Sequence, residues 1–450
     1  MNIYIIVEIV SRELDSKLLL ATIAAARGHK VILSDLESIL KGTQRGVLAP
    51  GIFHTKSLTP STDKLAIHKF FLKKGFKITS IDEEAGLDLS GYEQFSKTRF
   101  SDQTIGQASA VFGWGTEDVE SLKKYYLSYA SKIHKTGSPR VDLWKSIFNN
   151  YWEVPKSVPK KPFLLVSSNM AKANGILSLH ETLKLKKKSG YLKRNPKMFK
   201  QDLNLAAEAY LKTEAYIEAI KYLADNNRYD VVLRPHPAES VEAWKFYLDG
   251  IPNVHVIREG SITPWVNNAF AVMHNGCTTA LEATVSKKPL VTYVPFETSF
   301  DNHPPNKLGH RVKSLKELLS TVNAIFDSTK TTDQNDKEQI SDVISKKVFL
   351  DDNELAAEKM VNLWDSLADN SLSRSSNSTM FQLLLRANKL RKMIGIVKRF
   401  LLGTLLENNK FPPLNEEDIK NRVDKFQNIL GIKNLKCELL SDRTIQIKEK

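Results

Sequence analysis

The chain has 450 residues, more than one domain usually takes, so we expect two main domains and an extension. With 42% hydrophobic and 26% charged residues it has a globular composition, which excludes wholesale disorder and collagen-like repeats. Its two cysteines, Cys277 and Cys437, exclude a disulfide scaffold and a cysteine-rich zinc site and indicate a reducing compartment. The formal net charge of +14 points to anionic partners: nucleic acid, a membrane surface or small molecules.

The positive charge is concentrated in two short segments. Residues 181–200 hold eight bases and one acid, or +7, and residues 380–406 hold six bases and no acid, or +6. The rest of the chain is nearly neutral, so nucleic acid is not an expected partner. The sequence has no apolar run of about 18 residues and no basic region at its start, so neither a membrane-spanning helix nor a signal peptide is expected. We therefore expect a soluble, cytoplasmic protein.

The first 150 residues alternate between strand-like and helix-like patterns. The apolar run Ile3–Ile9 is typical of a strand buried on both faces. Ser11 can cap the helix that follows, and Gly28 ends that helix. Further strands are expected at about 29–34, 77–81 and 108–112, with helices at about 63–74 and 118–131. This alternation predicts a Rossmann-like domain with a doubly wound parallel sheet over residues 1–155.

The same alternation restarts after the proline- and lysine-rich segment Val154–Pro162, which we expect to be a linker. Strands are expected at about 163–167, 230–233, 254–257, 269–273 and 290–294, and helices at about 202–226, 278–286, 315–326, 337–348 and 354–367. These elements predict a second Rossmann-like domain with closing helices over residues 160–369. The basic segment 181–200 is expected to be a mobile loop of this domain.

Residues 370–450 form the predicted C-terminal extension. It begins with a polar segment that is typical of a flexible linker. Apolar residues recur every three or four positions in residues 380–406, which predicts a basic amphipathic helix suited to an anionic membrane leaflet or to packing on protein. A helix and a small hairpin around Ser441-Asp442 are expected to follow. The whole chain is thus predicted to be an α/β protein of two tandem Rossmann-like domains with a helical extension.

Polar side chains follow the strands of the second predicted domain, where open parallel sheets bind their ligands. The polar residues are Asn169, Arg234, His236, Asn275, Thr278 and Thr279, and the neighbouring Pro237 and Gly276 are predicted to belong to the same binding loops. The two threonine hydroxyls and the free N–H groups of a helix start can hold an anion. Glu282, one turn further along, can accept hydrogen bonds from a ribose diol. The alternative for this segment is an ordinary helix cap.

His236 stands between two prolines, which hold the backbone extended around it. A histidine at a strand end can donate to a phosphate, or protonate a leaving phosphate near neutral pH. Arg234 could add a second phosphate contact. The alternatives are a histidine that caps the next helix and an arginine with a structural role.

Three consecutive acids, Asp82, Glu83 and Glu84, follow a strand of the first predicted domain. If they are enclosed, their mutual repulsion raises the pKa of at least one carboxyl, which suits a general base for a sugar hydroxyl. Asp82 and Glu84 could instead bind Mg²⁺, and a solvated acidic loop is the third interpretation. Glu8 and Arg12 follow the first strand and are expected to line the same cleft.

Taken in order, these segments resemble the GT-B glycosyltransferases and, within that class, the bacterial surface-carbohydrate biosynthesis proteins. The matching pieces are VEIVSRELDSKLLLA, DEEAG, FGW, TGSPR, SSN, RPHPAES and HNGCTTALEA with KKPLVTYVP after it. They run from residue 7 to about 295, so the resemblance covers both predicted domains but not the extension. The chain is also similar, more distantly, to bacterial sialyltransferases and Kdo transferases, which use CMP-activated sugars.

The resemblance implies a division of roles. Those enzymes carry an acidic pair followed by glycine, a His-Pro motif and a Ser/Thr pair, whose counterparts here are Glu83-Glu84, His236-Pro237 and Thr278-Thr279. An acidic residue would be the acceptor base, His236 would contact the CMP phosphate, and the threonines would hold that phosphate. Ala85 stands between the acids and Gly86, which departs from the family pattern and leaves open which acid is the base.

We therefore expect a metal-independent glycosyltransferase of surface-polysaccharide biosynthesis. It would transfer Kdo or a nonulosonic acid from a CMP donor, as substrate and without a cofactor, to a glycan or lipid-linked acceptor. A lipid-linked acceptor would place the protein at the inner face of the cytoplasmic membrane, with residues 380–406 as a peripheral contact. The alternatives are a UDP-sugar glycosyltransferase, a sugar-nucleotide epimerase of the same architecture, and a non-enzymatic scaffold that binds polyanions or membranes.

Overall fold

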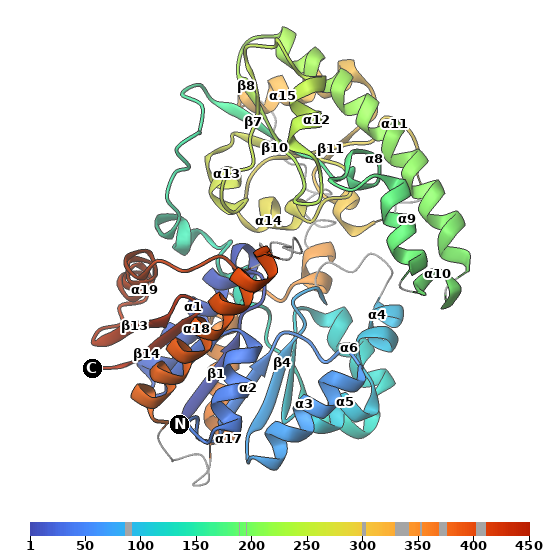
Figure 1. Ribbon diagram of the computed structural model, residues 1–450. Coiled ribbons are helices and arrows are strands. Elements are labelled where there is room, and N and C mark those ends of the chain that lie inside the picture. Colours follow the sequence, from blue (N-terminus) through green and yellow to red (C-terminus); the bar gives the residue numbers. More distant parts are fainter. Residues whose placement is uncertain are drawn as a thin grey trace. The chain divides into compact units, whose positions relative to one another are not determined.

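The protein folds into two compact units. The computed structural model describes residues 1–450 except 86–91, 189, 195, 299–302, 329–341, 352, 369–375 and 402–410. Unit 1 comprises Met1–Tyr151 and Ser345–Lys450, and unit 2 comprises Trp152–Ile344 (Figure 1). The chain therefore leaves the first unit, builds the second and returns to the first.

Unit 1 is built on an eight-stranded sheet in the order β13-β14-β2-β1-β3-β4-β5-β6. Neighbours from β2 to β6 pair in parallel, as predicted, because each crossover runs through a helix. All five residues of β1 are buried, as expected of a central strand covered on both faces. The strands are β1 (Asn2–Ile6), β2 (Lys30–Ser34), β3 (Gly51–Thr55), β4 (Lys77–Ile81), β5 (Ala110–Gly113), β6 (Ile133–Lys135), β13 (Leu435–Ser441) and β14 (Thr444–Glu449).

Helices cover both faces of this sheet (Figure 1). The first helix, α1, is buried on all sides, because the consecutive residues from Leu18 to Ala21 are each at most 1% exposed. The helices of unit 1 are α1 (Val10–Ala26), α2 (Leu36–Gln44), α3 (Thr62–Lys73), α4 (Tyr92–Arg99), α5 (Asp102–Gln107), α6 (Thr116–Tyr125), η2 (Leu127–Lys132), α7 (Pro139–Asp142), η3 (Ser146–Tyr151), α17 (Ala356–Leu367), α18 (Ser378–Leu401) and α19 (Glu416–Leu430).

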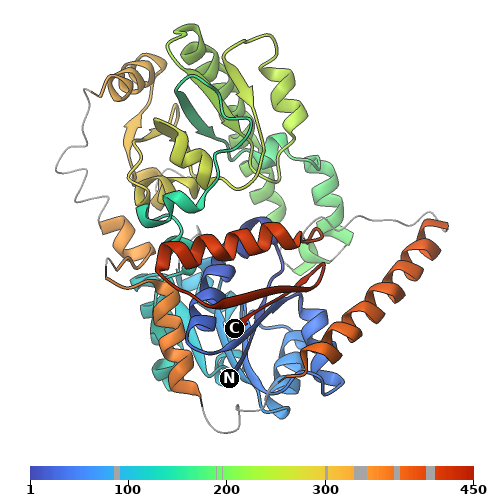
Figure 2. The same ribbon diagram turned by 90° about the vertical axis from the view of Figure 1, so that its left-hand side faces the viewer.

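The C-terminal residues belong to unit 1 instead of forming a separate extension, so the predicted boundaries at 369 and 370 are wrong. The hairpin around Ser441-Asp442 exists as predicted, but its second strand, β14, pairs antiparallel with β2 and extends the sheet (Figure 2). In α19, Phe426 stacks on Tyr151 with ring centroids 4.2 Å apart. Sequence patterns missed this arrangement because pairing partners more than 400 residues apart leave no local signal.

The returning hairpin is expected to be essential for the stability of unit 1. Ile447 is fully buried on β14, so Ile447→Ala should lower the free energy of unfolding by about 2–5 kcal/mol. Lys436→Ala, at an exposed position of β13, should change it by less than about 1 kcal/mol. Chemical denaturation of the two variants measures the difference. Equal midpoints would mean that the hairpin is not part of the folded sheet.

Unit 2 contains a six-stranded parallel sheet in the order β12-β11-β10-β7-β8-β9 within its described residues. Numbered from the first strand of the unit, this is the 3-2-1-4-5-6 order of the Rossmann fold. The fold-class prediction of two α/β units with doubly wound parallel sheets is therefore confirmed. The strands are β7 (Phe163–Ser167), β8 (Asp230–Arg234), β9 (Val254–Val256), β10 (Ala271–His274), β11 (Leu290–Tyr293) and β12 (His310–Val312).

The basic segment 181–200 is helical, so the prediction of a mobile loop is wrong. It contains most of α9, all of α10 and the start of α11, which runs for 29 residues. Buried Tyr216, Ile220 and Leu223 anchor α11 in the core of unit 2. The predicted helix at 337–348 lies partly outside the described residues. The helices of unit 2 are α8 (Ala171–Asn174), α9 (Leu179–Lys188), α10 (Tyr191–Arg194), α11 (Lys197–Asp225), α12 (Val241–Tyr247), α13 (Thr263–Asn268), α14 (Thr279–Val285), η4 (Pro304–Lys307) and α15 (Leu315–Phe326).

Candidate functional site

The two central strands of unit 2, β7 and β10, are neighbours at the point where the strand order reverses. Ligands of open α/β sheets bind beyond the carboxyl ends of the strands at such a point. Two predicted residues meet there, because Asn169 Nδ2 donates to the carbonyl oxygen of Gly276 at 3.0 Å. Gly276 has a φ of +68°, which favours glycine at this turn.

A small cluster of hydroxyl and thiol groups lies at the same point. Ser167 Oγ, Cys277 Sγ and Thr279 Oγ1 are pairwise 3.2 Å apart. Thr278 is partly exposed at the start of α14, and its side chain makes no capping hydrogen bond. Ser167 and Cys277 were not predicted as site residues, although Cys277 stands between Gly276 and Thr278 and Ser167 stands two residues before Asn169.

Asn275 has a structural contact on each side of its amide group. Its Nδ2 donates to the carbonyl oxygen of Tyr293 at 2.9 Å, and its Oδ1 accepts from Asn306 Nδ2 at 3.2 Å. Asn306 also accepts the N–H of Gly276, at 2.6 Å. Asn306 therefore fixes the loop after β10, and nothing in the sequence near residue 306 indicated it.

His236 is exposed at the end of β8, in the predicted position. Its Nδ1 lies 3.2 Å from the backbone nitrogen of Ala238, whose N–H donates to it. The neutral ring therefore carries its hydrogen on Nε2, which can donate to a ligand. Desolvation lowers the pKa of His236 below its usual 6.5, and the Glu239 carboxylate opposes this shift. A neutral ring at pH 7 favours a hydrogen-bond donor to phosphate over a general acid.

Glu239 joins the ends of β7 and β8. Its fully buried carboxylate accepts hydrogen bonds from Ser168 Oγ at 2.7 Å, the N–H of Met170 at 2.7 Å and Trp244 Nε1 at 2.6 Å. The loop that carries His236 is thereby fixed to the loop that carries Asn169. An acceptor role toward three donors arises only from tertiary packing, so local sequence patterns did not indicate it.

Arg234 holds the loop after β9. Its guanidinium donates to the carbonyl oxygens of Glu259 at 2.6 Å and Gly260 at 2.9 Å, and lies 5.1 Å from the ring centroid of Trp265. Burial lowers the pKa of Arg234 to about 10, opposed by the charges of Glu282 and Glu259. Glu282 itself is 2% exposed. These contacts favour structural roles, and phosphate and ribose contacts for the two residues stay predictions.

The three predicted acids lie at the carboxyl end of β4 in unit 1, and Asp82 is enclosed among them. Its carboxylate receives Arg99 Nε at 2.9 Å and Nη2 at 2.8 Å, and also the N–H of Glu84 at 3.0 Å. Burial raises the pKa of Asp82, while Arg99 lowers it. Because both oxygens of the Asp82 carboxylate accept hydrogen bonds from Arg99, Asp82 is better suited to hold this loop in place than to accept a proton.

Glu83 is also buried and lies 3.5 Å from the ammonium of Lys17. That ammonium pairs with Glu13 at 2.7 Å and donates to the carbonyl oxygen of Ile6 at 2.7 Å. Burial by itself raises the pKa of Glu13, but Lys17, the N–H of Glu8 and Lys56 outweigh it and hold the pKa at about 2. Lys17 was missed, because it looks like an ordinary residue of a helix.

Glu84 has the most accessible of the three carboxylates, with half of its side chain exposed. Arg12 lies 3.4 Å from it, so this predicted neighbour does reach the acids. Glu8 pairs with Lys56 at 2.6 Å at the same edge of the sheet. Gly86, the glycine of the family pattern, lies outside the described residues. Acidic and basic side chains thus alternate in one network of ion pairs at the carboxyl ends of the strands of unit 1.

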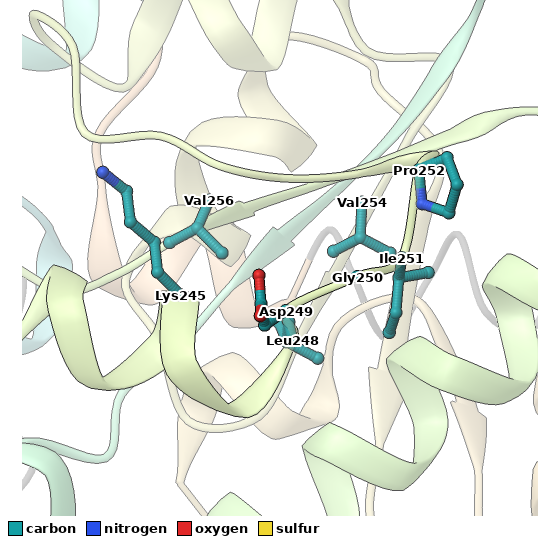
Figure 3. Close-up of a pocket in the computed structure, with 8 residues that line it drawn as sticks. All are labelled: Lys245, Leu248, Asp249, Gly250, Ile251, Pro252, Val254 and Val256. Atoms are coloured by element: carbon teal, nitrogen blue, oxygen red, sulfur yellow. The ribbon is translucent and has the colours of Figure 1, made fainter.

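Three further observations concern the described residues as a whole. No group of three or more His, Cys, Asp or Glu side chains among them could hold a metal ion. None of the helices in this part of the chain is long and apolar enough to cross a membrane. A pocket of about 480 Å³ lies beside β9 and α12 and contains none of the predicted site residues (Figure 3). Lys245, Asp249 and Gly250 are among the residues that line it.

No protein-family model and no curated protein matches the sequence. Solved structures similar to the chain include a UDP-N-acetylglucosamine 2-epimerase, 12% identical with a TM-score of 0.49, covering 83% of this chain and 98% of that one. A glycosyltransferase from Rickettsia africae is 12% identical with a TM-score of 0.43, covering 82% and 99%. The wall teichoic acid polymerase TagF is 11% identical with a TM-score of 0.40, covering 70% and 72%. These values describe a distant likeness in architecture and assign no residue and no activity to this chain.

Proposed function

We propose that the chain is a glycosyltransferase of surface-polysaccharide biosynthesis whose unit 2 binds a nucleotide-sugar donor. The observation that supports this best is the strand-order reversal of unit 2. Polar groups of β7, β8 and β10 stand at or beside it, among them Asn169, His236 and Thr278. A Rossmann-type sheet with such groups beyond its carboxyl ends is suited to a nucleotide.

The donor phosphate would be held chiefly by His236 and the loop after β10. His236 Nε2–H donates to a phosphate oxygen and offsets the charge that develops as the glycosidic bond to the leaving nucleotide breaks. The hydroxyl of Thr278 is available for a second contact. Because the ring is neutral at pH 7, we assign it charge stabilisation by a hydrogen bond and not proton donation.

The general base for the acceptor hydroxyl is assigned to Glu84 of unit 1. Asp82 is closed off by Arg99, and Glu83 is buried beside Lys17, whereas half of the Glu84 side chain is exposed. A base must reach the proton that it removes, which favours the accessible carboxylate. The deprotonated hydroxyl would attack the sugar carbon that bears the nucleotide.

Glu84→Gln is expected to lower transfer about 100- to 10,000-fold, because amide nitrogen and oxygen cannot accept the proton, while donor binding stays unchanged. Glu83→Gln is the matched control and should retain much more activity. Asp82→Asn should lower the melting temperature, since it breaks the bidentate pair with Arg99. Steady-state kinetics and calorimetry with the donor distinguish the three. Loss of transfer in Glu83→Gln alone would move the base to Glu83.

The proposed donor is CMP-linked Kdo or a nonulosonic acid, and the acceptor a glycan or a lipid-linked saccharide. Support for this choice comes from the resemblance of the acidic, His-Pro and Thr-Thr segments to CMP-sugar transferases. Calorimetry with CMP, UDP and GDP should show tightest binding for CMP, and turnover should release CMP in the presence of EDTA. Release of UDP would support the UDP-sugar transferase instead, and turnover without acceptor the epimerase. RNA binding with no nucleotide affinity would support the scaffold.

A peripheral membrane contact through residues 380–406 remains part of the proposal. The first turns of α18 bury Phe381 and Leu385 in the core of unit 1, while Met380, Leu383 and Leu390 are exposed. In this proposal the face of α18 that carries Phe381 and Leu385 packs on unit 1, and the face that carries the exposed side chains would contact the membrane. Residues 402–406 lie outside the described residues.

A further inference from the structure

One surface of unit 2 combines exposed apolar side chains with a high positive charge. We call it the hairpin surface and define it as residues 176–211, which include α9, α10 and the first half of α11. The large hydrophobic side chains exposed there are Ile176, Leu177, Leu185, Tyr191, Phe199, Leu203, Tyr210 and Leu211. Large exposed apolar patches on soluble domains usually mark an interaction site.

Three of these side chains form a row along α11. Phe199, Leu203 and Tyr210 follow one another at spacings of four and seven residues, which places them on one side of the helix. They are 49%, 41% and 57% exposed. Ala206 lies on the same side and is buried, so the row borders the packed face of the helix. Tyr216 and Leu223 bury that packed face in the core of unit 2, whereas the three row side chains stay about half exposed.

The exposed side of the hairpin surface carries a net positive charge. Residues 176–211 hold eight bases and three acids, or +5, and Lys184, Lys187 and Lys188 are exposed. Asp202, an acid of α11, is buried between Lys172 at 2.5 Å and Lys186 at 2.6 Å. That acid therefore stabilises the packing of α8, α9 and α11 and does not offset the exposed lysines.

We propose that the hairpin surface binds an anionic lipid bilayer. The aliphatic and aromatic side chains would enter the boundary between head groups and acyl chains, and the lysines would pair with lipid phosphates. A polyanionic glycan or a nucleic acid would satisfy the lysines but leave four leucines and an isoleucine in water. A second copy of the chain would cover the apolar residues but bring two positively charged segments together.

This surface is distinct from α18 and independent of the nucleotide site. It lies in unit 2, whereas α18 belongs to unit 1. The inference would stand if the proposed donor were wrong, because it depends on exposure and charge alone.

Sedimentation of the full chain with vesicles tests the proposal. Wild-type protein should bind vesicles of phosphatidylglycerol and phosphatidylcholine and not phosphatidylcholine alone. The double variant Phe199→Ser with Leu203→Ser should weaken binding at least about tenfold, because two apolar anchors are lost. Lys184→Gln with Lys187→Gln and Lys188→Gln should weaken it by about fivefold per lysine at low salt. Phe246→Ser is the matched control, since Phe246 is 79% exposed on α12, outside the hairpin surface.

Three outcomes would overturn the proposal. The first is equal sedimentation of the double variant and the wild type, with binding lost only in Leu383→Ser with Leu390→Ser on α18. The second is wild-type protein that does not bind anionic vesicles at all. The third is a wild-type dimer that the Phe199 and Leu203 substitutions dissociate, which would make a second copy the occupant. An unchanged circular dichroism spectrum and melting temperature of each variant show that the protein is folded.

Discussion

His236→Ala is expected to lower transfer about 100- to 1000-fold, the effect of removing one hydrogen-bond donor from a developing charge. The melting temperature should hardly change, because the ring is exposed and its one hydrogen bond in the structure is accepted from Ala238 in its own loop. Steady-state kinetics at saturating acceptor measure the loss. The effect should appear mainly in kcat, since the charge develops as the leaving nucleotide departs.

The pH dependence separates the assigned role of His236 from general-acid catalysis. The pKa of His236 is lowered from 6.5, so the ring is neutral above that value and becomes charged only in more acidic solution. A hydrogen-bond donor works in the neutral form, so activity should stay level from pH 7 to 8. A general acid would lose activity over the same range as its proton is lost. His180→Ala, at an exposed histidine of α9, is the control and should change neither kcat nor its pH profile.

Glu239→Ala is expected to produce the largest loss of stability in unit 2. Ser168, Met170 and Trp244 would each lose an acceptor in a site that water does not reach. Leaving such donors unsatisfied should lower the free energy of unfolding by about 3–5 kcal/mol. For a unit of this size the melting temperature should fall by on the order of 10 °C. Differential scanning calorimetry with and without CMP measures both the loss and the remaining nucleotide affinity.

Glu242→Ala is the matched control for that experiment. Glu242 is an exposed carboxylate in the first turn of α12, close in sequence to Glu239 but without its three partners. Its removal should lower the free energy of unfolding by less than about 1 kcal/mol. If the two variants melt at the same temperature, Glu239 is not the connection between the loops after β7 and β8 that the structure indicates.

Sequence patterns located the ends of the central strands well, while the binding and catalytic roles of the residues there stay predictions. Buried strands read as short apolar runs, and the residues after them stand at one edge of a parallel sheet. Asp82, Asn169, His236 and Gly276 were found in this way. Which of them remain accessible did not follow from the pattern, because accessibility depends on side chains from other elements. Arg99 donates two hydrogen bonds to the carboxylate of Asp82, and the carbonyl oxygens of Glu259 and Gly260 accept the hydrogen bonds of the Arg234 guanidinium.

Several contacts that sequence reasoning missed join residues that are far apart along the chain. Lys17 reaches Glu83, and Asn306 reaches Gly276 and Asn275. The hairpin at the C-terminus pairs with β2 by backbone hydrogen bonds. Each of these contacts forms only when the chain folds and produces no periodic pattern in the sequence.

By itself the sequence indicated two α/β units with parallel sheets, most of their helices and strands, and the two segments that hold nearly all of the excess charge, although it missed β3, β6, β12 and α2. Local patterns suffice for these features, because burial repeats every two or 3.6 residues and charge can be counted. Only the tertiary structure decided that the C-terminal residues complete the first sheet, that residues 181–200 are helical, and which polar groups stay accessible. Long-range pairing and competition for hydrogen bonds decide such questions, and both exist only once distant segments have come together.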